Sequence, residues 1–274
     1  MHDESNAGPR LSVVMAIDRM DAYLQPAIQS VLAQSFQDFE FLIVVNERLR
    51  EQHPEILRLC GHDPRVILLE APALGGLALA LNLGVAHSRS QYIARMDGDD
   101  ISLPERFAQQ VTYLDAHPDV MVLGCRVQLI GTEGKPLALS LPFYETDAQI
   151  RRQLPVRSPL QHPALLLRRS AVYAVGGYMF GRGVEDWELY LRMARLPGLR
   201  FHNLNELLFL YRRHPAQATA SGRIRSNYLD IAAFLFSEML ATRSPAYAFG
   251  ILFKHPLLSV TRRRLLHYVS RRKR

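Results

Sequence analysis

The sequence contains little of what small secreted or membrane-spanning proteins depend on. It has two cysteines, Cys60 and Cys125, and one tryptophan in 274 residues. Because both cysteines lie in apolar surroundings and form no C-x-x-C pair, we expect buried thiols in a reducing compartment, which excludes a disulfide scaffold and a zinc site. Residues 1–10 are polar, and no apolar run reaches the roughly 18 residues of a membrane-spanning helix. We therefore expect a cytoplasmic protein whose first ten residues are disordered.

The excess of positive charge is confined to one end of the chain. The sequence has 33 Lys+Arg against 26 Asp+Glu, a net charge of +7. Seven of the basic residues lie between Arg262 and Arg274, where there is no acidic residue. The rest of the chain is neutral, which argues against nucleic-acid binding. The basic end could contact anionic lipid or another polyanion.

Apolar runs alternate with helical patterns from Leu11 onward. Strands are predicted at 11–17, 39–45, 66–69 and 91–96, and helices at 21–34, 53–60, 77–87 and 104–117. This alternation predicts a doubly wound α/β fold with a mostly parallel central sheet. Short strands are expected within 120–139, followed by further elements up to a strand at 200–211. We expect one α/β domain over residues 11–222 and a helical extension with a basic tail over 223–274.

A cluster of acidic residues follows the strand predicted at 91–96. The sequence Asp97-Gly98-Asp99-Asp100 places three carboxylates within four residues, at the edge of an α/β sheet where ligands bind. Neighbouring carboxylates repel each other, so such a group is more stable beside a cation, and oxygen ligands suit Mg²⁺ or Mn²⁺. A solvated acidic turn without a cation is the alternative interpretation.

A second acidic pair, Glu185 and Asp186, lies about 90 residues later at the start of a predicted helix. Negative charge is favourable at a helix N-terminus, so capping alone could explain the pair. Together with the first cluster, the pair suggests that two separate acidic groups have two different functions. One group of carboxylates would bind a metal, and a separate carboxylate would take a proton from an attacking hydroxyl group.

Several segments, taken in order, resemble the family 2 glycosyltransferases of GT-A fold. They include LSVVMAI, AIQSVLAQSFQDFEFLIV, GGLALALNLGVAHSRSQYIARMDGDD, HPALLLRRSAVYAVGGY, EDWELYLRMAR and YRRHPAQATA. The resemblance extends from Leu11 to Ala220 and rests on the order and spacing of the segments. It implies an α/β/α sandwich that binds a nucleotide-sugar donor through Mg²⁺ or Mn²⁺. It further implies transfer of the sugar, with inversion, to a saccharide or lipid-linked acceptor in cell-surface polysaccharide assembly.

The resemblance assigns roles to the first acidic cluster and to a histidine far from it in sequence. Asp97 and Asp99 match the D-x-D motif, with Asp99 as a ligand of the metal and Asp97 near the ribose or donor sugar. Asp100 matches an aspartate that helps to hold this loop. His214, in Tyr-Arg-Arg-His, matches a histidine that approaches the metal in some relatives, although an ordinary surface histidine is the alternative.

The resemblance also implies a base and further donor-binding residues. Asp186 matches the catalytic base that deprotonates the acceptor, with Glu185 as its companion. The other positions expected near the donor are Ala16, Asp18, Asn46, Gly76, Asn82, Arg95 and His162. Structural roles remain open for Gly76 as a helix start and for Arg95 as part of an ion pair.

Two positions depart from the family pattern where the base should bind. Asp18-Arg19 stands in place of a common Tyr-Asn pair, and Asn46 occupies the position of an aspartate that reads the base. Asparagine still donates and accepts hydrogen bonds. A non-catalytic member that binds sugar nucleotides or a polyanion therefore stays open. A sugar-phosphate nucleotidyltransferase has less support, because Asp18-Arg19-Met20 is not a glycine-rich loop.

The C-terminal segment has two interpretations. Apolar residues from Tyr247 to Val260 precede the basic run, as in a helix that lies in the plane of a membrane surface. The alternative is a helical cap that packs on the domain and ends in a solvated basic tail.

Overall fold

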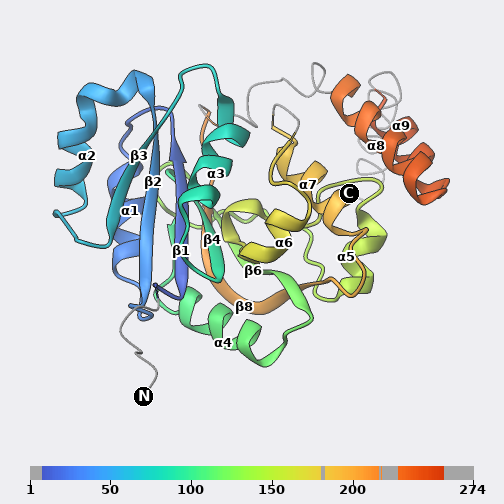
Figure 1. The fold of residues 1–274 in the computed structure, drawn as a ribbon, viewed down its shortest axis with the longest axis horizontal. Coiled ribbons are helices and arrows are strands. Elements are labelled where there is room, and N and C mark those ends of the chain that lie inside the picture. The colour runs from blue at the N-terminus through green and yellow to red at the C-terminus, as the bar shows by residue number, and fades with distance from the viewer. Residues whose placement is uncertain (1–7, 180–182, 216, 218–227, 256–274) are drawn as a thin grey trace.

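The computed structural model describes residues 8–179, 183–215, 217 and 228–255. Within these residues, eight strands form one sheet in the order β3-β2-β1-β4-β7-β6-β8-β5 (Figure 1). The strands are β1 (Leu11–Ile17), β2 (Phe39–Asn46), β3 (Val66–Ala71), β4 (Tyr92–Asp97), β5 (Ile101–Ser102), β6 (Val120–Ile130), β7 (Leu166–Arg168) and β8 (Arg200–Arg212).

Helices flank the sheet and follow the predicted alternation. They are α1 (Leu24–Leu32), α2 (His53–Leu59), α3 (Gly76–His87), α4 (Arg106–Ala116), α5 (Asp147–Gln153), α6 (Arg169–Ala174), α7 (Glu185–Met193), α8 (Tyr228–Thr242) and α9 (Ala246–Lys254). Two short 3₁₀ helices complete the set, η2 (Glu47–Gln52) and η3 (His162–Ala164).

The sheet is mixed but mostly parallel, as predicted. Strands β3, β2, β1 and β4 are parallel neighbours, β7 is antiparallel to β4 and β6, and β6 is parallel to β8. Val13 and Met15 of β1 belong to a core with α1, α2 and α4, whereas Val14 belongs to a second core with α3, α6 and α7. Because both faces of β1 are covered, its sequence is apolar without alternation.

The structure differs from the prediction in the second half of the sheet. Residues 120–139 were expected to form short strands, but β6 is one strand of 11 residues. It pairs with β8 along its whole length through register shifts around Arg126, which explains why its apolar pattern is interrupted. Strand β5 and helix η2 were not predicted, because two- and six-residue elements leave almost no periodic signal.

The cysteines match the prediction of buried thiols. Cys60 and Cys125 are both free and buried. Burial raises the pKa of each thiol to about 11, so both are protonated at neutral pH.

The C-terminal helices α8 and α9 pack on the domain beside α7. The Trp187 and Phe234 rings meet edge to face at 5.4 Å, and a Cβ added to Gly250 would lie 1.8 Å from the carbonyl oxygen of Pro155. None of the helices in the described residues is long and apolar enough to cross a membrane. The proposed domain boundary near 222 and the basic residues from Arg262 to Arg274 lie outside the described residues, so both remain predictions.

A side-chain clip joins α3 to the loop after α6. Asn82 Nδ2 donates to the Tyr178 carbonyl oxygen at 2.7 Å, and the Tyr178 N–H donates to Asn82 Oδ1 at 2.8 Å. Gly177, which precedes Tyr178, has φ +77°, and a Cβ there would lie 2.5 Å from Asn82 Oδ1. The clip therefore requires glycine at position 177 for two independent reasons.

This geometry predicts that Gly177→Ala destabilises the protein more than a matched glycine change. Gly198 has φ +73° but no neighbour within 4 Å of an added Cβ. Gly198→Ala should cost about 1 to 2 kcal/mol of unfolding free energy from backbone strain alone. Gly177→Ala should cost about 1 to 3 kcal/mol more, because the Cβ displaces Asn82. Urea unfolding of both variants measures the difference, and equal losses would show that the clip does not constrain position 177.

Candidate functional site

The carboxyl ends of the parallel strands gather several predicted residues at one edge of the sheet. Ala16 of β1 lies in register between Val44 of β2 and Asp97 of β4. Asp18 follows β1 and is exposed, and Asn46 ends β2. The topology therefore brings the predicted base-binding positions to the same edge as the acidic cluster.

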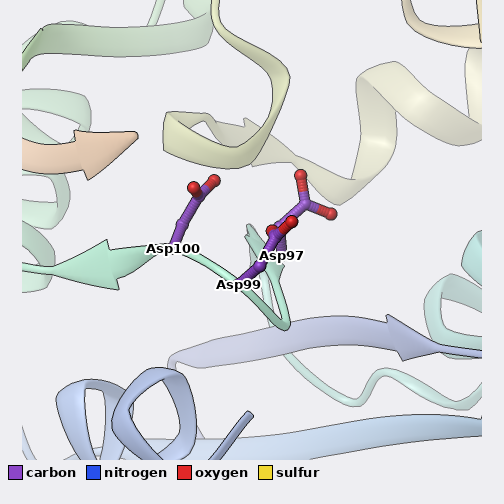
Figure 2. Close-up of side chains that lie close together, drawn as sticks. All are labelled: Asp97, Asp99 and Asp100. Carbon is purple, nitrogen blue, oxygen red and sulfur yellow. The ribbon is translucent and has the colours of Figure 1, made fainter. Parts of the chain in front are cut away.

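The acidic cluster occupies the turn between β4 and β5. Figure 2 shows the carboxylates of Asp97, Asp99 and Asp100 projecting from this turn, and one oxygen of each lies within 4.8 Å of the others. Asp100 is fully buried, whereas Asp97 and Asp99 are partly exposed. The sequence prediction that these three side chains converge is thus confirmed in the geometry of the turn.

The end of β8 and the segment after it hold the acidic turn. The Arg212 N–H donates to Asp100 Oδ1 at 2.7 Å, and Arg212 Nε donates to the Asp99 carbonyl oxygen at 2.8 Å. His214 Nε2 lies 2.9 Å from Asp99 Oδ2. Tyr23, just before α1, contacts both residues, with its ring 4.9 Å from that of His214 and 4.6 Å from the Arg212 guanidinium. His214 and Asp99, which were each predicted to lie at the metal, are therefore neighbours in the structure.

The electrostatics of the turn favour a bound cation. Burial raises the pKa of Asp100 well above its ordinary value, and the charges of Asp97 and Asp99 raise it further. Burial also raises the pKa of Asp97, with Asp99 adding to the effect and Arg95 opposing it. Asp100 Oδ2 is buried without a hydrogen-bond partner. The site thus offers three crowded carboxylates and an adjacent imidazole, and one carboxylate oxygen has no hydrogen-bond partner. This set of groups fits a divalent cation such as Mg²⁺ or Mn²⁺.

A buried arginine lies behind the acidic turn. Arg95, on β4, is 3% exposed and forms an ion pair with Asp97. Its charge lowers the pKa of Asp186 as well as that of Asp97.

His162 is buried and hydrogen-bonded to the Tyr178 hydroxyl at 2.9 Å. Burial, with Arg95 nearby, holds the pKa of His162 well below its ordinary value, so this imidazole is neutral at pH 7.

Asp186, in the first turn of α7, is the second carboxylate centre. Ser158 Oγ donates to Asp186 Oδ2 at 3.1 Å. Burial raises the pKa of Asp186 to about 6, and the charge of Glu185 contributes in the same direction. A carboxylate with a pKa near 6 is ionised at pH 7 and is a stronger proton acceptor than an ordinary aspartate.

Glu185 has a structural function in this arrangement. Its Oε2 accepts hydrogen bonds from the N–H groups of Gly183, at 2.7 Å, and Val184, at 2.9 Å. The side chain is buried at the start of α7 and satisfies donors that the helix itself leaves unpaired. The capping interpretation therefore describes Oε2 of Glu185, while the predicted roles of Glu185 and Asp186 in catalysis stay predictions.

Three predicted donor-binding residues make contacts within the protein. Gly76 begins α3 with φ +66°. Both polar atoms of the Asn82 amide are bonded to the Tyr178 backbone. Asn46 Oδ1 accepts from the Arg48 N–H at 3.1 Å, and Asn46 Nδ2 donates to the Ala73 carbonyl oxygen at 3.4 Å. These residues shape the edge of the site, and their contact with a donor remains a prediction.

Four residues of the site were not predicted from the sequence. Arg212 lies in the Tyr-Arg-Arg-His segment, so its nearness to His214 was a usable signal. Tyr178 ends the HPALLLRRSAVYAVGGY segment, so its nearness to that motif was also a usable signal. Tyr23 and Ser158 carry no local motif, and only the folded chain brings them to His214 and Asp186.

Comparison with known families decides the class of the protein. The family model for glycosyl transferase family 2 matches residues 12–176. The chain belongs to glycosyl transferase family 2. This family match spans β1 to α6 and includes the acidic turn at Asp97–Asp100. It supports a glycosyltransferase and gives no support to the nucleotidyltransferase alternative.

Curated relatives agree with the family assignment. The O-antigen biosynthesis glycosyltransferase WbnJ of Escherichia coli is 31% identical over 236 residues, which cover 85% of this chain and 90% of that protein. The amylovoran biosynthesis glycosyltransferase AmsE of Erwinia amylovora is 27% identical over 84% of this chain and 85% of that protein. Both alignments extend beyond residues 12–176.

Solved structures of low sequence identity confirm the GT-A fold. TarS 1–349 of S. aureus, in complex with UDP-GlcNAc, has a TM-score of 0.65 at 17% identity, with 88% of this chain and 71% of that chain covered. The mannosyltransferase PcManGT of Pyrobaculum calidifontis, in complex with GDP-Man and Mn²⁺, has a TM-score of 0.63 at 16% identity, with 91% and 70% covered. At this identity the likeness establishes the fold.

The capping geometry predicts that Glu185→Ala and Glu185→Gln differ in stability. Glu185→Ala leaves the N–H groups of exposed Gly183 and buried Val184 without their acceptor and should lower the unfolding free energy by about 1 to 2 kcal/mol. Glu185→Gln keeps a side-chain oxygen in place and should cost less than half as much. Thermal and urea unfolding measure both. Equal stability of the alanine variant and the unaltered protein would contradict the capping assignment.

Proposed function

We propose that this family 2 member is an inverting glycosyltransferase. It moves a sugar from a nucleotide-diphosphate sugar to a hydroxyl group of a saccharide or lipid-linked acceptor, in the assembly of a cell-surface polysaccharide. The observation that carries the proposal is the acidic turn at Asp97–Asp100, converging at the sheet edge with His214 against Asp99 and with Asp186 held separately on α7.

The relatives support the class of donor and pathway. WbnJ and AmsE are named for O-antigen and amylovoran biosynthesis, and the similar solved structures hold UDP-GlcNAc or GDP-Man. Asp99 and His214 would hold Mg²⁺ or Mn²⁺, which offsets the negative charge of a leaving diphosphate. Asp97, paired with Arg95, faces the ribose or donor sugar in this proposal. Asp18 and Asn46 line the side where the base would bind.

In the proposed reaction Asp186 accepts the proton of the acceptor hydroxyl group. The acceptor oxygen forms a bond to the anomeric carbon as the bond from that carbon to the diphosphate oxygen breaks. Attack from the face opposite the leaving group inverts the configuration. Ser158 keeps the Asp186 carboxylate oriented by donating to Oδ2, so that the other oxygen can receive the proton.

The donor assignment predicts metal-dependent binding of one nucleotide. Calorimetric titration of UDP, GDP, TDP, CMP and their sugar conjugates, with and without Mn²⁺, should identify it. Asp99→Ala should weaken this binding at least about 100-fold, because it removes a ligand and the partner of His214. Asp119→Ala, which removes an exposed carboxylate paired with Arg200, is the matched control and should bind normally. Absence of binding by every nucleotide would favour the non-catalytic alternative.

The base assignment predicts both a rate loss and a pH profile. Asp186→Asn should reduce turnover of the identified donor by about 10² to 10⁴, with donor binding unchanged. In the unaltered protein the rate should fall as the pH drops below about 6, because the protonated carboxyl cannot accept a proton. The hydrogen bond from Ser158 favours the ionised form of Asp186 and so lowers its pKa. Ser158→Ala removes this bond, so the pKa should rise and the rate should begin to fall at a higher pH.

Initial rates between pH 5 and pH 8 provide the measurement for all three proteins. Ser158→Thr keeps a hydroxyl donor and is expected to restore the original profile. Turnover of Asp186→Asn near that of the unaltered protein, with the fold intact, would show that another group removes the proton.

A further inference from the structure

Helices α8 and α9 form a hairpin beside α7 (Figure 1). Five large apolar side chains on this hairpin are between 50% and 75% exposed, and we call them the outer face. They are Leu229, Phe236, Leu240, Phe249 and Leu252. Contiguous exposed apolar side chains are uncommon on a water-soluble surface and mark a site of interaction.

The outer face lies opposite the face that packs on the domain. In α8, Ile231 and Leu235 are buried, whereas Leu229, Phe236 and Leu240 follow the i, i+7, i+11 spacing of the other side. In α9 the buried residues are Tyr247 and Gly250, and the exposed Phe249 and Leu252 again face away. A helix that only covers a protein core carries polar residues on its outer side. These two helices are apolar on both sides.

We propose that the outer face binds an anionic lipid surface, with α8 and α9 lying in its plane. Charge complementarity supports this occupant. Directly after α9 the sequence continues through residues 256–274, which contain seven basic residues and no acidic one. Apolar side chains beside a run of Arg and Lys match an interface of acyl chains and anionic headgroups.

Geometry and charge disfavour the other occupants. With 15 residues, α8 is about 22 Å long, shorter than the roughly 30 Å hydrocarbon core, so the hairpin would lie along the surface. A second copy of this chain carries the same net charge of +7, so repulsion between like charges disfavours a symmetric pair. A negatively charged lipid surface matches both the apolar outer face and the basic residues that follow α9 in the sequence.

The hairpin also contacts the helix that carries the proposed base. Phe234 of α8 packs on Trp187, and Lys254 of α9 lies 5.0 Å from the same ring. Trp187 is the residue next to Asp186 on α7. A lipid-bound hairpin would therefore hold α7 near the surface, which suits an acceptor carried on a lipid. That last step rests on the proposed function, whereas lipid binding itself does not.

Vesicle flotation of the full-length chain tests the proposal. The probes are vesicles of phosphatidylcholine alone and of phosphatidylcholine with phosphatidylglycerol in equal parts. We expect binding to the anionic vesicles only, weakening as salt is added. The double variant Phe236→Glu, Leu252→Glu should bind at least about tenfold more weakly. Leu139→Glu with Leu207→Glu adds the same charge at exposed apolar positions elsewhere and should bind as the unaltered protein does.

Several outcomes would overturn the proposal. One is absence of vesicle binding by the unaltered protein, and another is equal binding by the outer-face variant. A third is a dimer in solution that the outer-face variant converts to a monomer, without vesicle binding, which would make the outer face an interface between two copies. Metal-dependent nucleotide binding, measured separately, shows whether the donor site is intact in each variant.

Discussion

The crowding of three carboxylates at the end of β4 is the constraint around which the site is built. Burial and mutual repulsion raise the pKa of Asp97 and of Asp100, so the ionised cluster is costly without positive charge nearby. The chain supplies part of that charge through Arg95 from below the turn and Arg212 from β8. A divalent cation would supply the positive charge that is still missing, and the same cation would offset the negative charge of a diphosphate.

The same arrangement ties distant parts of the chain together. Arg212 and His214 reach the turn only because β8 runs parallel to β6 and passes the end of β4. Arg95 influences Asp97 and Asp186 alike, so its buried charge stabilises the ionised form at both carboxylate centres. Arg95 is therefore a charged group that acts on both carboxylate centres.

Much of the fold could be predicted because its strands are apolar on both faces. The bounds predicted for β1 agree with the structure, those of β2 differ by one residue at one end, and those of β4 differ by one residue at each end. Strand β6 was harder to predict, because pairing with β8 keeps it extended through the irregularity at Arg126. The pattern of apolar residues within β6 does not reveal that β6 pairs with β8, because β8 lies far away in the sequence. The two-residue β5 likewise exists only because Ser102 and Ile101 meet β8.

The site shows the same limit at the level of side chains. The sequence prediction names Asp99, Asp186 and His214 because each lies in a segment that resembles a family motif, and the role of each stays a prediction. Ser158 and Tyr23 lie outside any motif, and their roles arise from tertiary contact. Glu185 shows the reverse case, since its motif suggested chemistry but its oxygen is used by the backbone of Gly183 and Val184. A motif therefore selects candidate residues, while the folded structure shows which of their atoms already have hydrogen-bond partners.

The hairpin of α8 and α9 extends this reasoning beyond the matched family segment, which ends at residue 176. Trp187 is buried between α7 and the hairpin, and its indole N–H donates to the Leu154 carbonyl oxygen at 2.8 Å. The helix that bears Asp186 is therefore held from the core on one side and from the hairpin on the other. A surface bound by the hairpin would therefore lie near the proposed base, because the hairpin packs on the residue next to Asp186. The hairpin and the acidic turn have no residue in common. In the proposed function, donor chemistry and acceptor access would lie on different elements of the fold and could therefore vary independently.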